Sequence, residues 1–359
     1  MTIKTSITKM FGVKHPILNA PMGPFRTTEL AIAVAEAGGI GTISHTTVSM
    51  DGYEKDRLTA LKKNLDYAVE HTDGIFGFNI ITSRLTENCD ELISGAAKHI
   101  MANPKLREQC LYALSSAGSS RRMPENKDFQ KLRATTEIKH FHVAPALWLA
   151  DKCVVSGCDG LVVTGFEGGG HQSYEKVASL VLLQQVQQKH PNIPKIACGG
   201  YATGAGLAAA LSLGAGAIAM GSRFIASKDS EFHENYKGVI PPAKAQDTII
   251  RTGVLGTIRL WKNKYSLSKG LVTSKEEKIE EEKALADHRA EISKEQLAEE
   301  LRKDAKAAFA AYQGDMENGG VLLGQSIGIV NKIEKVSDII ERIVKEAEEK
   351  LKTVVGYIQ

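Results

Sequence analysis

The chain has 359 residues, of which 43% are hydrophobic and 24% are charged. This composition is that of an ordinary globular protein, and the length allows a large core, either as two domains or as one α/β barrel. The formal net charge of +3 is small, and no basic cluster is interleaved with aromatic residues. We therefore expect no nucleic-acid partner.

The sequence also lacks the signs of secretion and of membrane insertion. Its five cysteines form no Cys-x-x-Cys pair, and their odd number suits reduced thiols. The amino-terminal residues lack the apolar core of a signal peptide. Residues 196–222 carry no charge, but they are rich in Gly and Ala and are interrupted by a glycine turn, which predicts a buried strand, helix and strand. We expect a cytoplasmic protein with no membrane partner.

Short apolar runs alternate with helical patterns along the first 220 residues. Continuous apolar runs are typical of parallel strands that are buried on both faces. We predict eight such strands, at residues 16–20, 40–44, 75–80, 110–114, 138–143, 160–164, 195–198 and 217–220.

Helical patterns fill most of the intervals between these strands. Thr28–Ala37 has a threonine cap at residue 27 or 28 and ends at two glycines, and Ala205–Leu213 ends at a glycine. Ser173–His190 ends before a proline. Strand and helix alternating eight times predicts an α/β protein with a (β/α)8 TIM barrel, and a doubly wound sheet is the alternative.

The carboxyl-terminal third has a different pattern. Lys275–Lys306 is dense in Glu and Lys, which predicts a solvated helical face, and Glu334–Val355 has one apolar stripe, which predicts an amphipathic helix. We divide the chain into a barrel core at 1–230 and a mostly helical segment at 231–359. This segment would pack over the barrel and return the loop Gly324–Gly328 to the active site. Its charged helices could also pair two copies into a homodimer.

Three motifs match signatures of other functions, but the context of each motif argues against that function. Gly214–Ala219 matches a dinucleotide fingerprint, but it follows a helix and opens a strand, the reverse of what that fingerprint requires. Gly324–Gly328 matches a hydrolase nucleophile elbow, but that fold needs a histidine after the serine, and the last histidine is His288. His140 and His142 share one face of a strand, which suits ordinary strand residues better than metal ligands.

The segment Gly165–His171 follows a buried strand and contains three consecutive glycines before its histidine. Glycine lets a ligand approach the main chain closely, and histidine can exchange a proton near neutral pH. The segment could be a plain turn before a helix, or the floor of a cofactor site with an acid or base at its edge.

Glycine turns also follow the last two predicted strands. Gly199-Gly200 follows the seventh strand, and Gly221-Ser222 follows the eighth. In barrels the loops at these places often bind phosphate through backbone N–H groups, so the turns predict a phosphorylated ligand or cofactor. At the same rim, Ala20-Pro21-Met22 would form an apolar ledge for a planar ring, and Asn79 offers a donor and an acceptor.

In order along the chain, these segments resemble the nitronate monooxygenase family, which includes FMN-dependent enoyl-ACP reductases and NADH:quinone reductases. The resemblance covers nearly the whole chain. It rests on residues 16–22, 37–41, 165–171, 197–200, 220–224, 259–263, 314–317 and 324–326. It implies a TIM barrel with an added helical segment and non-covalently bound FMN.

The resemblance also implies roles for individual residues. His171 would be the catalytic histidine that faces the flavin, and no metal is implied. The FMN contacts would be Ala20, Met22, Asn79, Thr164, Gly169, Gly199, Gly200, Gly221 and Ser222, with Gln325 near the cavity. Many members carry a lysine at the end of the fifth barrel strand, and the residue at that position here is Val143. Without that charge the reduced, anionic flavin would be stabilised less.

Three functions follow as hypotheses. The leading one is an FMN-dependent oxidoreductase of the nitronate monooxygenase type, which oxidises alkyl nitronates or nitroalkanes with O2 and uses His171 to handle the substrate proton. The alternative is a reductase that uses NAD(P)H as a transient co-substrate to reduce an enoyl thioester or a quinone. The third is a non-catalytic barrel that keeps a phosphate site. Each would take a small molecule as its main partner.

Overall fold

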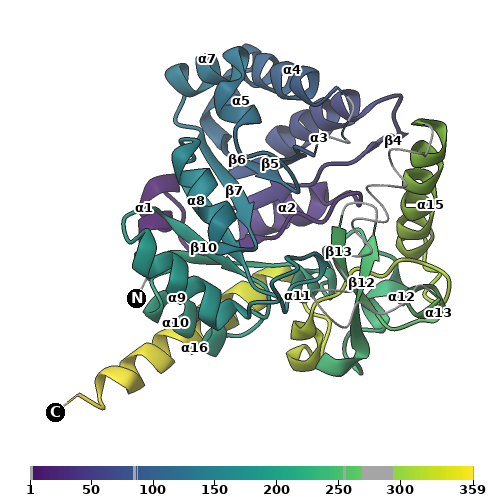
Figure 1. Cartoon of the computed structure of the whole chain (residues 1–359). Helices are drawn as coiled ribbons and strands as arrows, with labels where there is room; N and C mark the ends of the chain where they lie inside the picture. The colour runs from purple at the N-terminus through teal and green to yellow at the C-terminus, as the bar shows by residue number, and fades with distance from the viewer. Residues whose placement is uncertain (1–2, 84–85, 87, 254–255, 269–293, 359) are drawn as a thin grey trace.

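The computed structural model describes residues 3–83, 86, 88–253, 256–268 and 294–358. Its centre is a sheet of eight parallel strands surrounded by helices (Figure 1). In chain order these strands are β1 (Ile17–Asn19), β2 (Gly41–Ile43), β5 (Phe76–Ile81), β6 (Cys110–Ser116), β7 (Lys139–Ala144), β8 (Gly160–Thr164), β10 (Lys195–Cys198) and β11 (Ala217–Met220). Each coincides with a predicted strand. The TIM-barrel prediction is therefore confirmed, and the doubly wound alternative is wrong.

The barrel closes between its first two strands. β1 pairs with β11 on one side, and on the other side the Ile40 amide donates to the Ile17 carbonyl at 3.0 Å. The buried Asn19 side chain completes this seam. Its amide nitrogen donates to the Thr42 carbonyl at 2.7 Å, and its oxygen accepts from the Thr42 amide at 2.7 Å. Asn19 at the end of the first strand thus joins two strands that share few main-chain hydrogen bonds.

Large side chains fill the barrel interior, and a short helix closes one end of it. α1 (Ser6–Phe11) buries Ile7 and Phe11 against the interior side chains of the strands. The Phe11 ring lies edge-on to Tyr112, with 5.8 Å between the ring centroids. The Thr5 hydroxyl donates to the Gly216 carbonyl just before β11, so α1 covers the amino-terminal ends of the strands. The carboxyl-terminal ends are left as the place for a ligand.

The helices that cover the barrel follow the predicted alternation. They are α2 (Thr28–Glu36), α3 (Arg57–His71), α4 (Cys89–Ala102), α5 (Pro104–Gln109), α6 (Arg122–Glu125), α7 (Lys127–Thr135), α8 (Leu147–Val155), α9 (Ser179–Lys189), α10 (Gly204–Ser212) and α11 (Ser222–Ile225). A hairpin of β3 (Val48–Ser49) and β4 (Gly52–Tyr53) precedes α3.

One predicted helix starts later than expected. The prediction was Ser173–His190, but α9 begins at Ser179 and residues 173–178 form a loop. The Glu167 carboxylate fixes the start of α9, because its Oε2 accepts from the Ser179 amide at 2.9 Å. A side chain from the preceding strand-end loop thus caps this helix. That long-range contact is not visible in the local pattern of the sequence.

Besides helices, the segment after the barrel contains a hairpin that the sequence analysis does not predict. The strands β12 (Thr248–Gly253) and β13 (Gly256–Trp261) pair antiparallel. The other elements are α12 (Glu234–Gly238), η1 (Ala245–Asp247), α13 (Lys264–Leu267), α15 (Lys294–Tyr312), η2 (Gln325–Ile329) and α16 (Val336–Val355). Much of the predicted charged segment Lys275–Lys306 lies outside the described residues, which resume at Lys294.

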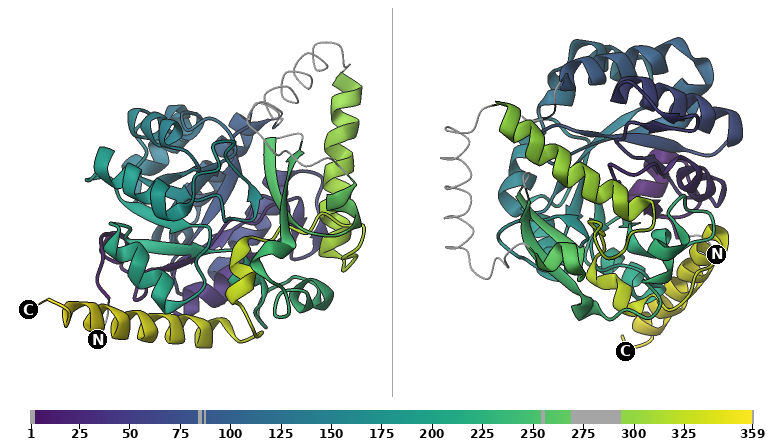
Figure 2. Two further views of the ribbon diagram at one scale, coloured as in Figure 1. Left: turned by 60° about the horizontal axis from the view of Figure 1, so that its bottom comes forward. Right: turned by 90° about the vertical axis from the view of Figure 1, so that its right-hand side faces the viewer.

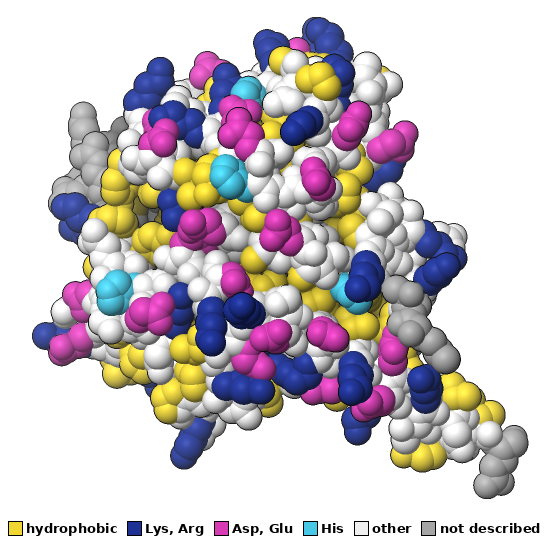
Figure 3. Space-filling view, turned by 180° about the vertical axis from the view of Figure 1, so that it is seen from behind, with side chains coloured by type: hydrophobic (Ala, Val, Ile, Leu, Met, Phe, Trp, Pro, Cys, Tyr) yellow, Lys and Arg dark blue, Asp and Glu magenta, His cyan; other side chains and the backbone are white. Residues whose placement is uncertain are grey.

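The last predicted helix is confirmed. α16 buries Val336, Ile339, Ile340, Ile343 and Val344, the predicted apolar stripe, and also Ala347. It packs against α10 and α2, and its carboxyl-terminal end extends away from the body of the molecule (Figure 2). None of the described helices has both the length and the apolar content that crossing a membrane requires. On the face shown in Figure 3, acidic and basic side chains are interspersed.

Candidate active site

A cavity of about 1200 Å³ opens at the carboxyl-terminal ends of the barrel strands. His171 lines it together with residues from seven of the eight barrel strands or the turns directly after them, and from the loop before η2. The predicted ligand-binding residues that line it are Ala20, Met22, Asn79, Thr164, Gly169, Gly199, Gly200, Gly221 and Ser222. Gln325 is not among the lining residues, but its neighbours Gly324 and Ser326 are. A direct role for Gln325 stays a prediction.

One end of the cavity is built from glycine. Gly199 and Gly200, directly after β10, have φ values of +86° and +87°, a region that other residues rarely adopt. A Cβ atom at Gly199 would lie 2.7 Å from the Gly165 carbonyl oxygen. Gly221 is different, because a Cβ atom there would meet nothing closer than the Met22 sulfur at 3.8 Å and the Ala20 Cβ at 3.9 Å. A side chain at Gly221 would therefore occupy the space beside the Ala20–Met22 ledge.

The glycine loop after β8 and the loop before η2 cross beside this end and are hydrogen-bonded to each other. A Cβ atom at Gly169 would lie 2.7 Å from the Gly324 nitrogen, so only bare backbone allows the crossing. The Gln325 amide donates to the Glu167 carbonyl at 2.8 Å, and the Gly324 amide donates to the Ser222 hydroxyl oxygen at 3.0 Å. The segment after α15 is thereby attached to both the β8 and the β11 loops.

A buried arginine fixes the glycine loop after β8 from the other side. Arg259 on β13 donates from Nε and Nη2 to the Phe166 carbonyl at 3.1 and 2.9 Å. Its guanidinium also lies 4.7 Å from the centroid of the Phe166 ring. These contacts with Arg259 explain how a loop rich in glycine keeps one conformation next to His171.

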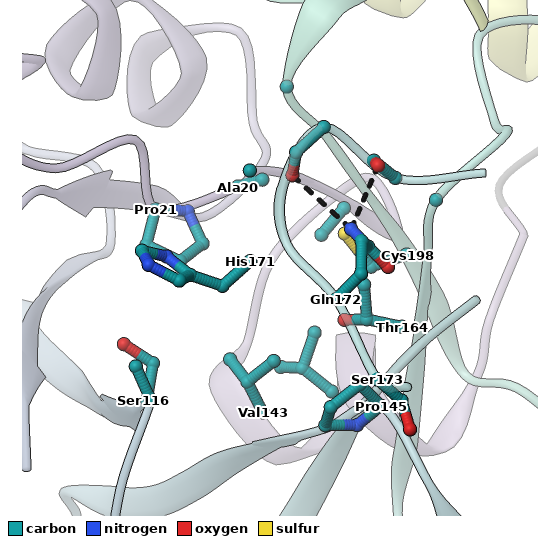
Figure 4. A pocket seen from close by; sticks show the side chains of 18 of the residues that line it. Ala20, Pro21, Ser116, Val143, Pro145, Thr164, His171, Gln172, Ser173 and Cys198 are labelled. Carbon is teal, nitrogen blue, oxygen red and sulfur yellow. Dashed lines mark hydrogen bonds between the residues drawn. The ribbon is translucent and has the colours of Figure 1, made fainter. Parts of the chain in front are cut away.

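His171 lies on a short strand that a distant hairpin completes. β9 (Gly170–His171) pairs antiparallel with β13, with Ile258 opposite His171. Its imidazole is exposed to the cavity, and Figure 4 shows it among the side chains that line it. Because protein walls replace bulk water around the ring, the pKa of His171 is lowered, and the Asp304 carboxylate on α15 acts in the opposite direction. A lowered pKa leaves the imidazole neutral at pH 7, ready to accept a proton.

The wall opposite the glycine end carries Asn79, Ser116 and Val143. Asn79 donates from Nδ2 to the Ser116 hydroxyl at 3.0 Å and to the Leu114 carbonyl at 3.2 Å. Val143, on β7, is uncharged and lines the cavity, and Figure 4 shows His171, Ser116 and Val143 around a common space. The neighbouring His142 is buried, and burial lowers its pKa to about 4, so it supplies no positive charge there.

Sequence reasoning missed two polar groups of the cavity. The buried Gln172 donates from Nε2 to the Gly168 carbonyl at 2.8 Å, shown as a dashed line in Figure 4. Its Oε1 and the hydroxyl of the buried Thr257 have no hydrogen-bond partner within the described residues. Its position directly after His171 is the signal in the sequence that could have identified Gln172 as a cavity residue. Thr257 reaches the cavity only because β13 pairs with β9.

The two histidines on β7 are linked through one serine hydroxyl. The Ser115 hydroxyl lies 2.7 Å from His140 Nε2 and 2.6 Å from His142 Nδ1, so the two rings share one buried hydroxyl. Across the described residues no three His, Cys, Asp or Glu side chains gather as metal ligands. Burial holds the pKa of both imidazoles below the ordinary value. The interpretation as ordinary strand residues fits these contacts.

The arrangement suits a ligand that carries both a phosphate and a planar ring. The glycine turns after β10 and β11 expose main chain to an anion, and Ser222 adds a hydroxyl. Ala20, Pro21 and Met22 supply an apolar ledge, and the unpartnered oxygens of Gln172 and Thr257 can hydrogen-bond to ring atoms. A neutral imidazole at the edge can then accept or donate a proton.

Comparison with known proteins places this site in a family. Residues 4–346 match the family model described as nitronate monooxygenase. The solved structure of FabK from Thermotoga maritima has 30% sequence identity and a TM-score of 0.78, and the match covers 99% of this chain and all of that one. A probable nitronate monooxygenase of Staphylococcus saprophyticus is 26% identical over 372 residues, which cover 97% of this chain and 99% of the relative.

A third relative is matched over only part of its length. It is a (3aS,4S,5R,7aS)-5-hydroxy-7a-methyl-1-oxo-octahydro-1H-indene-4-carboxyl-CoA dehydrogenase of Mycobacterium tuberculosis, 31% identical over 261 residues. The match covers 71% of this chain but only 65% of the length of that relative. The family model and the full-length matches to other relatives agree with the fold and the cavity. The chain therefore belongs to the nitronate monooxygenase family.

Proposed function

We propose that this protein is an oxidoreductase that binds FMN in the barrel-mouth cavity and oxidises alkyl nitronates or related carbon acids with O2. The observation that carries the proposal is the presence, in one cavity, of a bare-glycine end and a neutral histidine. The Staphylococcus relative, which matches over nearly its whole length, supports the same activity. A cytoplasmic location and a homodimer stay predictions.

The residues of the cavity fit FMN. Gly199, Gly200, Gly221 and Ser222 would hold its phosphate, and Ala20 and Met22 would lie against its ring system. A glycine at position 221 keeps open the space that a side chain would fill. When bound, FMN would supply the electron-accepting chemistry, which no amino-acid side chain provides at neutral pH.

His171 would act on the substrate proton. A nitroalkane loses a proton from carbon to become its nitronate, and a neutral imidazole in a partly desolvated wall can accept that proton. Where the substrate arrives already as the nitronate, the ring N–H of neutral His171 would donate a hydrogen bond to its negative oxygen. Positioned acid–base groups contribute roughly 10²- to 10⁴-fold to rate. We therefore expect His171→Ala to lower turnover by about that factor.

The test compares His171→Ala with His171→Gln by turnover on propyl nitronate and by FMN affinity. Both variants should bind FMN with nearly unchanged affinity, because the phosphate end is intact, and both should lose turnover. Turnover equal to that of the unmodified protein in either variant would remove the role proposed for His171. A protein that neither carries nor takes up FMN would instead support the non-catalytic barrel.

A second candidate, NAD(P)H-dependent reduction of an enoyl thioester or quinone, is favoured by two observations. Val143 places no charge at the position where many family members carry a lysine, and the cavity is large. Its volume of about 1200 Å³ exceeds the ~300–1000 Å³ of sites for one drug-sized ligand, which leaves room for an extended substrate. Anaerobic mixing with NADH, NADPH or propyl nitronate separates the candidates, because only the true donor should bleach the flavin absorbance.

A further inference from the structure

The charges that line the cavity are all of one sign. Among its described lining residues there is no Asp or Glu, while Arg121 and Lys152 both lie on its wall. Neither belongs to the glycine end, because Arg121 follows β6 and Lys152 is on α8. Within the described residues neither side chain forms an ion pair. The cavity therefore has two places that suit an anion, one made of backbone and one made of side chains.

The loop that presents Arg121 is held in an unusual conformation. Ala117 has a φ of +51°, a value that costs an alanine conformational energy. A Cβ atom at Gly118 would lie 2.2 Å from the Thr82 carbonyl oxygen, so the loop is pressed against the end of β5. The Ser119 amide donates to the Thr82 carbonyl, and the hydroxyls of Ser120 and Ser156 are 2.7 Å apart. Residues 116–121 are thus fixed between β5 and α8.

The neighbouring wall, on α8, pairs a cation with an aromatic ring. Lys152 Nζ lies 4.7 Å from the centroid of the Trp148 ring, one helical turn earlier on α8. Trp148 lines the cavity and is 39% exposed, a large exposure for a tryptophan. The adjacent carboxylate of Asp151 does not neutralise Lys152, because it contacts Lys189 and His190, each at 2.7 Å. Lys152 keeps its charge available next to an indole surface.

We propose that Arg121, Lys152 and Trp148 form a second ligand subsite, which binds the phosphates and base of an adenine nucleotide. This inference rests on the flavin cavity of the proposed function and adds to it an extended substrate or co-substrate. Two cations that form no ion pair within the described residues favour phosphate, since guanidinium and ammonium groups bind phosphate oxygens by charge-assisted hydrogen bonds. An exposed indole stacks on a planar base. The reactive end of the ligand would extend toward His171.

Two ligands carry this chemistry. Coenzyme A thioesters and nicotinamide dinucleotides both join an adenine nucleotide to a distant reactive group. A simple alkyl nitronate has neither a base nor a phosphate, so it would not use the subsite. The subsite therefore concerns the second candidate function more than the first, and its occupancy can be measured without turnover.

The first test is calorimetric titration of the FMN-loaded full-length protein with ADP, 3′,5′-ADP, adenosine and inorganic phosphate. We expect both nucleotides to bind, Arg121→Gln and Lys152→Gln each to weaken them by about 10-fold, and the double variant by about 100-fold. Trp148→Ala should weaken the nucleotides and adenosine alike. Lys105→Gln, an exposed lysine on α5 outside the cavity, is the matched control and should change nothing.

Two results would overturn the subsite. One is equal nucleotide affinity in the unmodified protein and the Arg121→Gln/Lys152→Gln variant, and the other is no nucleotide binding to the FMN-loaded protein. Inorganic phosphate binding as tightly as ADP would also overturn it, because the base would then contribute nothing. Nucleotide binding to a protein that lacks flavin turnover would leave the subsite standing and refute only the proposed function.

Steady-state kinetics then identifies the source of the nucleotide. The same double variant is assayed with NADH and crotonyl-CoA, and with the crotonyl thioester of N-acetylcysteamine, which has no nucleotide. A KM raised about 100-fold only for NADH assigns the subsite to the dinucleotide, and one raised only for crotonyl-CoA assigns it to the thioester. Equal KM values for every substrate in the variant and the unmodified protein contradict the proposal.

Discussion

The two ends of the cavity offer different groups to a charged ligand, main chain at one end and side chains at the other. At the glycine end, Gly199, Gly200 and Gly221 present main chain, and backbone lies so close around Gly199 that no side chain fits. At the other end, which we call the nucleotide rim, Arg121 from the loop after β6 and Lys152 and Trp148 from α8 present side chains. A backbone site can hardly change without disturbing the fold. A side-chain site can change with little effect on the fold.

This difference separates cofactor from substrate. The glycine end is built into the strand ends of the barrel, so it suits a ligand that is bound in every turnover. The nucleotide rim and the walls near His171 and Val143 depend on single side chains. We expect substitution of Gly199 to change stability and FMN binding together, and substitution of Gly221 to change FMN binding alone. Substitutions on the walls should change chemistry while the fold persists.

Gly199→Ala should have the largest effect. The residue has a φ of +86°, and the added Cβ would lie 2.7 Å from the Gly165 carbonyl oxygen. Strain and overpacking together should cost about 2–5 kcal/mol of unfolding free energy and should abolish FMN binding. Gly157→Ala is the matched control, since Gly157 has a φ of +75° with no atom within 4 Å of the added Cβ. It should cost only about 1–2 kcal/mol.

Thermal melts and FMN titration check this pair. If Gly199→Ala and Gly157→Ala are destabilised equally and both bind FMN, then the close backbone contacts at Gly199 do not matter. In that case the glycine end would be no more constrained than an ordinary turn.

Gly221→Leu tests whether glycine is needed for the fold or for the ligand. The nearest atoms to an added Cβ are 3.8 and 3.9 Å away, so the side chain should enter the cavity without a clash. We expect a nearly unchanged melting temperature and an FMN affinity lower by at least ~100-fold, since the ligand and the leucine compete for one space. Gly238→Leu, in open space on α12, is the control. A Gly221→Leu protein that binds FMN normally would move the proposed site elsewhere.

Val143→Lys should tune the flavin without removing it. A cation near the ring stabilises the reduced, anionic form, so the midpoint potential should rise by about 30 mV, which corresponds to about 1.4 kcal/mol for two electrons. Val143→Met, which adds length without charge, is the control. Dye-coupled reduction measures the potential. An equal rise in both variants would show that bulk, and not charge, is responsible.

Much of the fold could be predicted because each barrel strand is a continuous apolar run. The β12–β13 hairpin was missed, since its role is to pair with β9, a strand of two residues that has no pattern of its own. The late start of α9 was missed because Glu167 caps it from another loop. In both cases a contact between distant segments determines the local structure.

The site shows the same division. Gly199 and Gly200 could be predicted to form a turn because few residues other than glycine adopt their backbone angles. The place of His171 on the cavity could be predicted because it directly follows a run of glycines. Arg121 and Lys152 could not be predicted, since each is one cation among many in the sequence. Only the fixed loop at residues 116–121 and the packing of α8 bring them to the same cavity. Side chains at this end of the cavity can be identified only when the positions of the loops are known.

Asp304→Asn should have the smallest effect, because Asp304 acts on His171 through its charge. Burial lowers the pKa of His171, and the Asp304 carboxylate opposes that shift. Removing the carboxylate should therefore lower the pKa of His171 further. The limb of the kcat/KM pH profile that reports His171 is identified as the one that disappears in His171→Gln. In Asp304→Asn this limb should move to lower pH, while the rate at pH 8 stays nearly constant.

Tyr265→Phe is the control, since it removes the hydroxyl that contacts Asp304 at 3.0 Å but keeps the carboxylate. A limb that moves to higher pH, or moves equally in Tyr265→Phe, would show that the walls near His171 respond to packing and not to charge.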